Sequence, residues 1–420
     1  MKNKKFLALA LAAAMTLSLA ACGGDSSNAG GSNSSAGNSS TSTGDTATGG
    51  STGGTTVKEV VDPTGAAFKV GGTGPLTGDA SIYGLAAYRG AQIAVNEINA
   101  EGGAVQFELR YEDDQNQAEA ANNAYNALKD WGMQISLGSV TTQPGISTSE
   151  FNYQDRIFAL TPSASSPDVI ANRDNVFQMC FSDPNQGLAS AQYIAEQGLG
   201  EKVFIIWKND DVYSTGIKEQ FEAEAERLGL NVVGDATFTT DTSNDFTVQL
   251  TQAQQADADL IFLPMYYQPA SLILTLADSM GYEPKFFGVD GMDGILTMEN
   301  FDTSLAEGVM LLTPFNADAT DEATVAFVEK YESLYGETPN QFAADGYDCI
   351  YALKLALETA GCTPDMAAEA INDALIETFP TITLNGLTGD GTGITWDSTG
   401  AVSKAPKGMV IQDGAYVGMD

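Results

Sequence analysis

The amino-acid sequence predicts an α/β protein built from two doubly wound parallel-sheet lobes, joined by a hinge that the chain crosses several times. Strand-like and helix-like segments alternate from Ala66 onward, and short connections between them are typical of parallel sheets with helices on both faces. The segments fall into two clusters, and the chain after Ala66 is long enough for two domains of ordinary size.

The first cluster opens with a helix and a strand of opposite periodicity. Apolar residues recur at steps of three and four in the helix, at Tyr88, Ala91, Val95 and Ile98. Gly102-Gly103 ends this stripe, as glycine commonly ends a helix. Apolar and polar residues then alternate from Val105 to Tyr111, which is the period of two expected of a strand.

The second cluster repeats this succession of strands and helices. We expect its strands at Val203 to Trp207, Asn231 to Phe238, Leu260 to Leu263 and Lys285 to Gly288. We expect its helices at Tyr213 to Leu228, Asn244 to Ala256 and Pro269 to Met280. In open α/β sheets ligands lie beyond the carboxyl ends of the strands, so the informative residues are those that follow each strand.

The chain divides into a leader, a linker and two discontinuous lobes. We expect a signal peptide at 1–21, a linker at 22–60, a first lobe at 66–183 plus 315–379, and a second lobe at 184–314 plus 380–420. The crossings between the lobes are expected near Pro184, Pro314 and Pro380.

The amino terminus predicts export and a lipid anchor. A short apolar stretch opened by lysines leads to Leu19-Ala20-Ala21-Cys22, which is typical of a secretory signal and too short for a membrane span. The small-small-Cys ending resembles the lipobox of bacterial lipoproteins. That resemblance implies that Cys22 is lipidated and that the protein is extracytoplasmic and anchored to the cell membrane. The Gly-, Ser- and Thr-rich residues that follow predict a flexible tether.

Composition excludes several classes of function. The net charge is −36, from 55 acidic and 19 basic residues, so binding to nucleic acid or to anionic lipid surfaces is not expected. The chain contains no histidine. This excludes the Ser-His-Asp triad, the Cys-His pair and His-ligated zinc. We expect neither a cofactor nor a metal, and we expect a monomer.

The remaining cysteines are expected to be small core residues. Cys180, Cys349 and Cys362 form no CxxC motif. Cys349 and Cys362 lie near the two ends of one helical stretch, about 20 Å apart. A disulfide requires Cα atoms within about 7 Å, so this pair should not form one.

Polar residues cluster after three strands of the first lobe. Gly71 to Gly78 is a weak match to the dinucleotide-binding glycine motif, because Pro75 interrupts it and Thr77 replaces the last glycine. Gly138 to Pro144 and Thr161 to Pro167 are rich in hydroxyl groups. Each could simply cap a helix, or the two together could form a cradle for a carboxylate. The spacing alone does not favour the carboxylate cradle over simple helix capping.

The motifs taken in order resemble a known family. The pattern runs through Gly74 to Gly78, Tyr83-Gly84, Gly90, Ala94 to Gly103, Tyr111 to Asp114, Gly138 to Pro144, Thr161 to Pro167, Asp210 to Gly216 and Trp396 to Gly400. It is similar to the bacterial leucine/isoleucine/valine-binding proteins, which have the type I periplasmic binding fold. The resemblance extends over essentially the whole chain after the linker.

This resemblance implies a bound amino acid and assigns its contacts. Ser139 matches the serine that holds the α-carboxylate, and Ser163 matches a backbone carbonyl that accepts an ammonium proton. Ser165 matches a residue that contacts both ends of the zwitterion. Asp290 matches the acid that pairs with the ammonium, although the family usually has the longer Glu there. The aromatic walls of the side-chain pocket match Tyr83, Tyr213, Tyr267 and Phe342.

The function that we expect is capture of an amino acid, branched-chain or otherwise aliphatic, for an ABC importer in the membrane. The ligand would be enclosed as the two lobes close by hinge bending. A different small solute, such as an amide, urea, an aromatic acid or a peptide fragment, is the main alternative because of the shorter Asp290. A surface enzyme is a weaker alternative, since no nucleophile elbow or metal-ligand spacing occurs.

Overall fold

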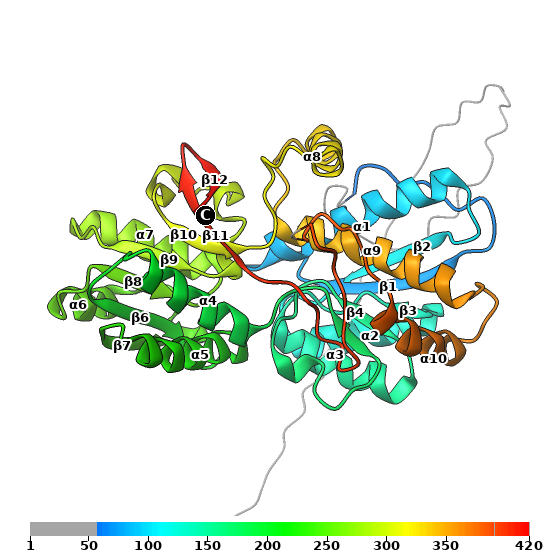
Figure 1. Cartoon of the computed structure of the whole chain (residues 1–420), viewed down its shortest axis with the longest axis horizontal. Helices are drawn as coiled ribbons and strands as arrows, with labels where there is room; N and C mark the ends of the chain where they lie inside the picture. Colours follow the sequence, from blue (N-terminus) through cyan, green and yellow to red (C-terminus); the bar gives the residue numbers. More distant parts are fainter. Residues whose placement is uncertain (1–56, 390, 420) are drawn as a thin grey trace, which may run out of the picture. The chain divides into compact units, whose positions relative to one another are not determined.

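The computed structural model describes residues 57–389 and 391–419, so the predicted signal peptide, Cys22 and most of the predicted linker lie outside the described residues. Two sheets organise the described chain (Figure 1). The prediction of an α/β fold with two mostly parallel sheets is confirmed. Within the described residues, no helix has both the length and the apolar character needed to cross a membrane.

The first sheet is wholly parallel and has the strand order β2-β1-β3-β4-β5. Its strands are β1 (Phe68–Gly74), β2 (Phe107–Asp113), β3 (Ile135–Ser136), β4 (Ala159–Thr161) and β5 (Val176–Gln178). The helices of this lobe are α1 (Ser81–Glu101), α2 (Ala118–Trp131), α3 (Thr142–Asp155), α8 (Glu322–Tyr335), α9 (Gln341–Ala360) and α10 (Ala368–Thr378). Helices α1 and α9 pack together on one face, and α2 and α3 lie on the other (Figure 1).

The second sheet has the order β12-β11-β10-β9-β8-β6-β7. Its strands are β6 (Val203–Lys208), β7 (Val232–Phe238), β8 (Leu260–Leu263), β9 (Lys285–Gly288), β10 (Met310–Thr313), β11 (Lys407–Gln412) and β12 (Ala415–Gly418). Its helices are α4 (Asp183–Glu196), α5 (Val212–Leu228), α6 (Thr247–Gln255) and α7 (Tyr267–Met280). Strands β11 and β12 pair antiparallel, a departure from the parallel pattern that the sequence predicts.

The central strands of this sheet are buried on both faces because their side chains alternate. In β6, Val203 and Ile205 join the core beneath α4 and α5. Phe204 and Ile206, which point the other way, join the core beneath α6 and α7. A strand in the middle of a doubly covered sheet therefore appears in the sequence as a continuous apolar run.

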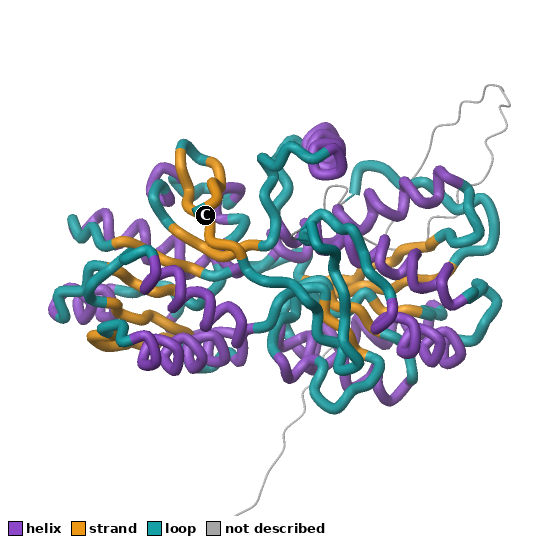
Figure 2. Tube along the Cα trace, in the orientation of Figure 1, coloured by secondary structure: helices purple, strands orange, loops and turns teal. Residues whose placement is uncertain are grey.

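The chain passes between the lobes after β5, after β10 and again before β11. The sequence places the third crossing near Pro380, but the structure places it later. Trp396 Nε1 donates to the Gln178 carbonyl at 2.7 Å, and Thr388 N donates to Asp348 Oδ2 at 2.9 Å. These bonds hold the long loop between α10 and β11 on the first lobe (Figure 2). The crossing therefore lies at Ser403–Pro406, while Pro380 only ends α10.

The cysteine prediction is confirmed. Cys180, Cys349 and Cys362 are free and buried.

Two glycines allow α1 and α9 to pack backbone against backbone. A Cβ on Gly90 would lie 1.8 Å from the Ala343 carbonyl oxygen. A Cβ on Gly346 would lie 2.2 Å from the Ala87 carbonyl oxygen. Since backbone atoms cannot rotate away from such contacts, any larger side chain would push the helices apart.

We expect Gly90→Ala to lower the free energy of unfolding by about 1–3 kcal/mol through overpacking, although alanine favours a helix. Gly103→Ala is the matched control, because a Cβ there meets no atom within 4 Å. Urea unfolding followed by circular dichroism measures both variants. A Gly90→Ala protein as stable as the parent would contradict the packing described above.

Candidate ligand-binding site

The carboxyl ends of strands from both sheets face one small cavity. Residues from the first lobe and from the second contribute to it. Its lining is Tyr83, Val140, Thr141, Thr142, Ser163, Ser165, Tyr213, Tyr266, Asp290, Gly291 and Phe342. Loops that follow β3, β4, β8 and β9 therefore meet at the position where open α/β sheets bind ligands.

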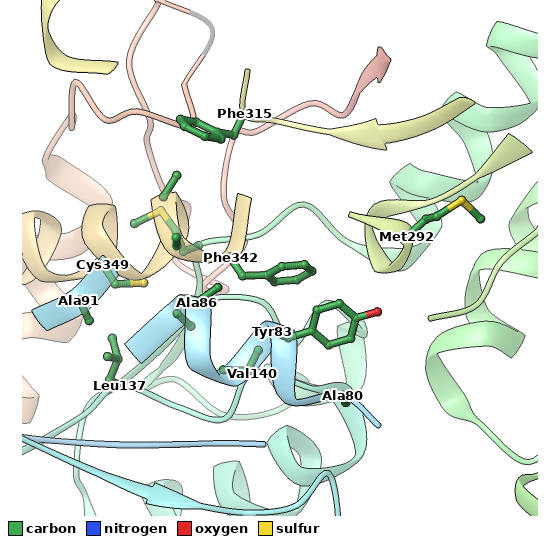
Figure 3. Packing of buried hydrophobic residues seen from close by; sticks show 14 of the residues in the cluster. Ala80, Tyr83, Ala86, Ala91, Leu137, Val140, Met292, Phe315, Phe342 and Cys349 are labelled. Atoms are coloured by element: carbon green, nitrogen blue, oxygen red, sulfur yellow. The ribbon is translucent and has the colours of Figure 1, made fainter. Parts of the chain in front are cut away.

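Aromatic rings fill most of this space. Figure 3 shows the rings of Tyr83 and Phe342 side by side, projecting from α1 and α9 toward the segment that carries Met292. The centroid of the Tyr83 ring lies 4.5 Å from that of Phe342 and 5.2 Å from that of Tyr266. The cavity that remains is about 10 Å³, roughly the space that one water molecule needs. An amino acid therefore fits only if the lobes separate or these rings move.

Tyr83 joins the two lobes by hydrogen bonds. Its hydroxyl donates to the Gly291 carbonyl and accepts from the Tyr267 N–H at 3.1 Å. Gly291 lies in a crowded position, because a Cβ there would lie 2.6 Å from the Tyr213 hydroxyl, 2.9 Å from the Tyr266 ring and 3.0 Å from the Met265 carbonyl oxygen. The closed arrangement thus depends on the Tyr83 phenol of the first lobe and on the close approach of Gly291 to Tyr213 within the second lobe.

Asp290 is the acidic group of the cavity. It begins the 3-10 helix Asp290–Met292 directly after β9 and is 3% exposed. Asp290 Oδ1 accepts from the Tyr213 hydroxyl at 2.5 Å, and its backbone N–H donates to Gln186 Oε1 at 3.1 Å. Burial raises the pKa of Asp290 to about 6, and the hydrogen bond from the Tyr213 hydroxyl opposes that rise. The carboxylate is held in place by this neutral group, which leaves its charge uncompensated.

Hydroxyl groups and a helix amino terminus are the contribution of the first lobe to the cavity wall. Thr141 is the N-cap of α3 but makes no capping bond with its side chain. The Thr141 and Thr142 hydroxyls are buried and have no hydrogen-bond partner among the described residues. Burial raises the pKa of the Tyr266 phenol, while a hydrogen bond from the Thr142 backbone moderates that rise. Free donors at a helix amino terminus suit an anion such as a carboxylate.

Six of the eight ligand residues expected from the sequence line the cavity, namely Tyr83, Ser163, Ser165, Tyr213, Asp290 and Phe342. Their roles in binding stay predictions. The other two, Ser139 and Tyr267, do not line it.

The Ser139 side chain is buried within its own lobe and forms its hydrogen bonds there. Its hydroxyl lies 2.7 Å from Thr73 Oγ1 and 3.1 Å from Thr148 Oγ1. Its carbonyl accepts from Thr161 Oγ1 at 2.6 Å. Thr141 and Thr142 occupy the cavity wall instead, and they belong to the same hydroxyl-rich segment that the sequence singles out.

Tyr267 packs against Tyr83 at 5.1 Å from outside the cavity, and its neighbour Tyr266 lines the cavity instead. Tyr266 is the N-cap of α7, and Tyr267 is the first residue of the helix. The sequence offers two adjacent tyrosines here. Only the position at which the helix starts decides which ring points inward.

Comparisons with known proteins agree with this arrangement. A family described as periplasmic binding protein matches residues 67–405. A Leu/Ile/Val-binding protein homolog of Brucella melitensis is 26% identical over 361 residues, covering 84% of this chain and 94% of the relative. An amino acid binding protein of Pseudomonas aeruginosa is 27% identical over 319 residues, covering 74% of this chain and 83% of the relative.

Solved structures share the fold. The branched-chain amino acid transporter substrate-binding protein LivJ of Streptococcus pneumoniae, in complex with isoleucine, has a TM-score of 0.75 and 25% identity, covering 83% of this chain and 97% of that one. The leucine-binding protein LivK of Thermotoga maritima has a TM-score of 0.74 and 25% identity, covering 84% and 98%. A solute-binding protein of R. palustris in complex with benzoate, at 18% identity and a TM-score of 0.74 over 84% and 95%, shows the same fold alone.

Tyr83→Phe should shift the unliganded protein toward separated lobes by about tenfold or more, since it removes two bonds worth about 1 kcal/mol each. Small-angle X-ray scattering detects the shift as a larger radius of gyration. Tyr125→Phe is the control, because its hydroxyl bonds to Asp155 within the first lobe. An equal radius of gyration for both variants would show that the phenol of Tyr83 does not hold the lobes together.

Proposed function

The chain belongs to the periplasmic binding protein family, and on this premise we propose that it captures an amino acid between its lobes and presents it to an ABC permease. One observation carries the proposal. The first lobe brings buried hydroxyl donors and a helix amino terminus to the cavity wall, and the second lobe brings the uncompensated Asp290. An α-amino acid has a carboxylate and an ammonium at the corresponding poles.

The energetics of burial favour a zwitterion over a singly charged solute. A charge removed from water is costly unless it is paired. An aromatic acid would satisfy the Thr141 and Thr142 hydroxyls but would leave Asp290 unpaired. A neutral amide or urea would leave the carboxylate with weaker, uncharged donors. An amino acid neutralises both poles.

An aliphatic side chain suits the walls of the cavity. Tyr83, Tyr213, Tyr266 and Phe342 present ring surfaces, and burial of a Val- or Leu-sized group against such walls contributes about 1.5–3 kcal/mol. The names of the Brucella and Pseudomonas relatives and the ligand of the Streptococcus structure agree with this choice. We therefore favour a branched-chain or other aliphatic amino acid.

A different small solute remains the second candidate because of one residue. Asp290 is one methylene shorter than the Glu usual in the leucine/isoleucine/valine-binding proteins that this chain resembles. Its carboxylate is also anchored by Tyr213. The shorter reach moves the acid away from the space that an α-ammonium occupies when the acid is Glu.

Closure of the lobes is the signal that the permease would read. A ligand contacts Asp290 of the second lobe and Thr142 of the first at the same time only when the lobes are closed, so it stabilises that state. Binding without turnover is the expected activity. The chain contains no histidine, which excludes the Ser-His and Cys-His pairs of many hydrolases. Chemical conversion of a bound ligand would overturn this assignment.

A thermal-shift screen tests the class of ligand. Leucine, isoleucine and valine should raise the melting temperature, because a ligand that binds only the folded state stabilises it by mass action. Acetamide, urea and benzoate, each at the same concentration, should leave it unchanged. Stabilisation by benzoate or urea but by no amino acid would favour the second candidate.

Asp290→Asn should lower the affinity for leucine, or for whichever amino acid the screen finds, by about 100-fold or more. Removal of one member of a buried charge pair costs about 3–5 kcal/mol. Isothermal titration calorimetry measures the change. Asp278→Asn on the exposed side of α7 changes the same net charge away from the cavity and should bind normally. Equal affinities for the two variants would refute the pairing of Asp290 with the ammonium.

We propose that the predicted signal peptide and Cys22, which lie outside the described residues, direct the mature protein to the outer side of the membrane. The sequence around Cys22 supports a lipid anchor, and we propose that the protein acts there as a monomeric lipoprotein. Cys22→Ser should move most of the protein from the membrane fraction to the soluble fraction, because the acyl chains provide the anchor. Immunoblots of the two fractions measure this. Retention of the variant in the membrane would contradict the lipoprotein assignment.

A further inference from the structure

Asp183 is a buried carboxylate behind the cavity wall. It is the first residue of α4 and is 0% exposed. The Ser165 hydroxyl is near enough to moderate its pKa. Neither oxygen of the Asp183 carboxylate, however, forms a regular hydrogen bond within residues 57–389 and 391–419. Such an arrangement is costly for an ionised group, since a buried charge without a partner loses its hydration uncompensated.

The first turn of α4 connects the two loops that carry the polar wall of the cavity. The Asp183 N–H donates to the Ser165 carbonyl at 3.1 Å. One turn further along, Gln186 Oε1 accepts from the Asp290 N–H at 3.1 Å, and Gln186 Nε2 has no partner among the described residues. Asp183 is thus fixed directly behind Ser165, on the same helix turn that positions Asp290.

The charged side chains that act most on Asp183 are acidic, and the partly positive amino terminus of α4 is the opposing charge beside it. The titratable groups that act on it are Asp290, Asp211 and Asp168, and each raises its pKa further after the main effect of burial. The lysines nearest this region have other partners. Lys404 Nζ lies 2.6 Å from Asp345 Oδ1, and Lys208 lowers the pKa of Asp211. Within the described chain, no lysine or arginine forms an ion pair with Asp183 or Asp290.

We propose that Asp183 acts with Asp290 as a pair of buried charges that makes lobe closure depend on a cationic group in the ligand. This inference rests on the proposed capture of a ligand between the lobes and specifies the ligand class. When the first lobe covers the two acids, they lose water. An ammonium among them offsets that loss, whereas a neutral or anionic ligand does not. Asp183 is a positioning and charge-compensating residue, and it need not contact the ligand.

The inference predicts a dependence of closure on pH in the absence of ligand. Burial raises the pKa of Asp183 well above its ordinary value and that of Asp290 to about 6. An acid whose pKa is higher in the closed state binds protons on closure. Closure is therefore favoured as the pH falls and disfavoured as the pH rises through 6. Between pH 8 and pH 5 the unliganded protein should become more compact.

Small-angle X-ray scattering of the unliganded full chain between pH 8 and pH 5 tests this first consequence. Asp183→Asn should be more compact than the parent at pH 8 and should show a weaker change with pH. Asp278→Asn is the matched control, because Asp278 is exposed on α7 and is not among the charges that act on Asp183, so its removal should leave the profile as in the parent. Asp183→Ser serves as a second variant if Asp183→Asn does not fold.

Matched probes test the requirement for a cation. Isopentylamine is leucine without its carboxylate, and 4-methylpentanoate is leucine without its ammonium. At pH 8, isopentylamine should raise the melting temperature of the parent more than 4-methylpentanoate does. By calorimetry, the ratio of the affinity for isopentylamine to that for 4-methylpentanoate should fall about 10-fold in Asp183→Asn and stay within about twofold of the parent in Asp278→Asn, because only the first variant removes a carboxylate from behind the cavity wall.

Two results would overturn the inference. One is a pH profile and a ratio of amine to acid affinity that are the same for Asp183→Asn and Asp278→Asn. The other is stronger stabilisation by 4-methylpentanoate than by isopentylamine. Failure of leucine to bind the parent would instead count against the amino-acid assignment. The scattering profile and the comparison of amine with acid would still decide the role of Asp183.

Discussion

The arrangement of this protein depends on one constraint, which is that charges in a closed cleft must be compensated inside it. Asp290 is 3% exposed, its carboxylate accepts from the neutral Tyr213 hydroxyl, and its backbone N–H donates to Gln186. The Tyr213 bond orients the carboxylate without neutralising it, so a cation is still needed for a stable closed state. The buried hydroxyls of Thr141 and Thr142, which have no partner among the described residues, need a hydrogen-bond acceptor in the same way. Affinity and closure therefore come from the same interactions.

The two sheets make this compensation possible because they hold the polar groups on separate lobes. Gly90 and Gly346 allow α1 and α9 to pack closely, which brings Tyr83 and Phe342 to one point of the first lobe. Gln341 extends from the start of α9 across to the second lobe, where its Nε2 donates to the Asp290 carbonyl at 3.0 Å. A change in the packing of α1 against α9 would thus be felt at the cavity, since both of its rings move with these helices.

Sequence patterns predict the fold well wherever burial leaves a clear pattern of apolar residues. Strand β8 and strand β9 begin and end where the apolar runs do, because both are covered on two faces. The antiparallel hairpin of β11 and β12 was not predicted, although Asp413-Gly414 between alternating residues is a hairpin signal and both have positive φ. The third crossing was misplaced because single side chains such as Trp396 and Asp348, which leave no periodic pattern, hold the loop before it.

The local sequence does not predict which side chains face the cavity, and this bears on the choice of ligand. A motif identifies the segment that carries the hydroxyls, but not which hydroxyl faces inward, and here Ser139 bonds to Thr73 and Thr148. The closed cavity is about 10 Å³ and is bounded by Tyr83, whose hydroxyl already bridges the lobes. Any ligand must displace these rings and replace the bonds that they make. Selectivity therefore rests on how completely a solute restores the interlobe contacts, and a zwitterion with a compact apolar side chain restores more of them than a solute with a single polar end.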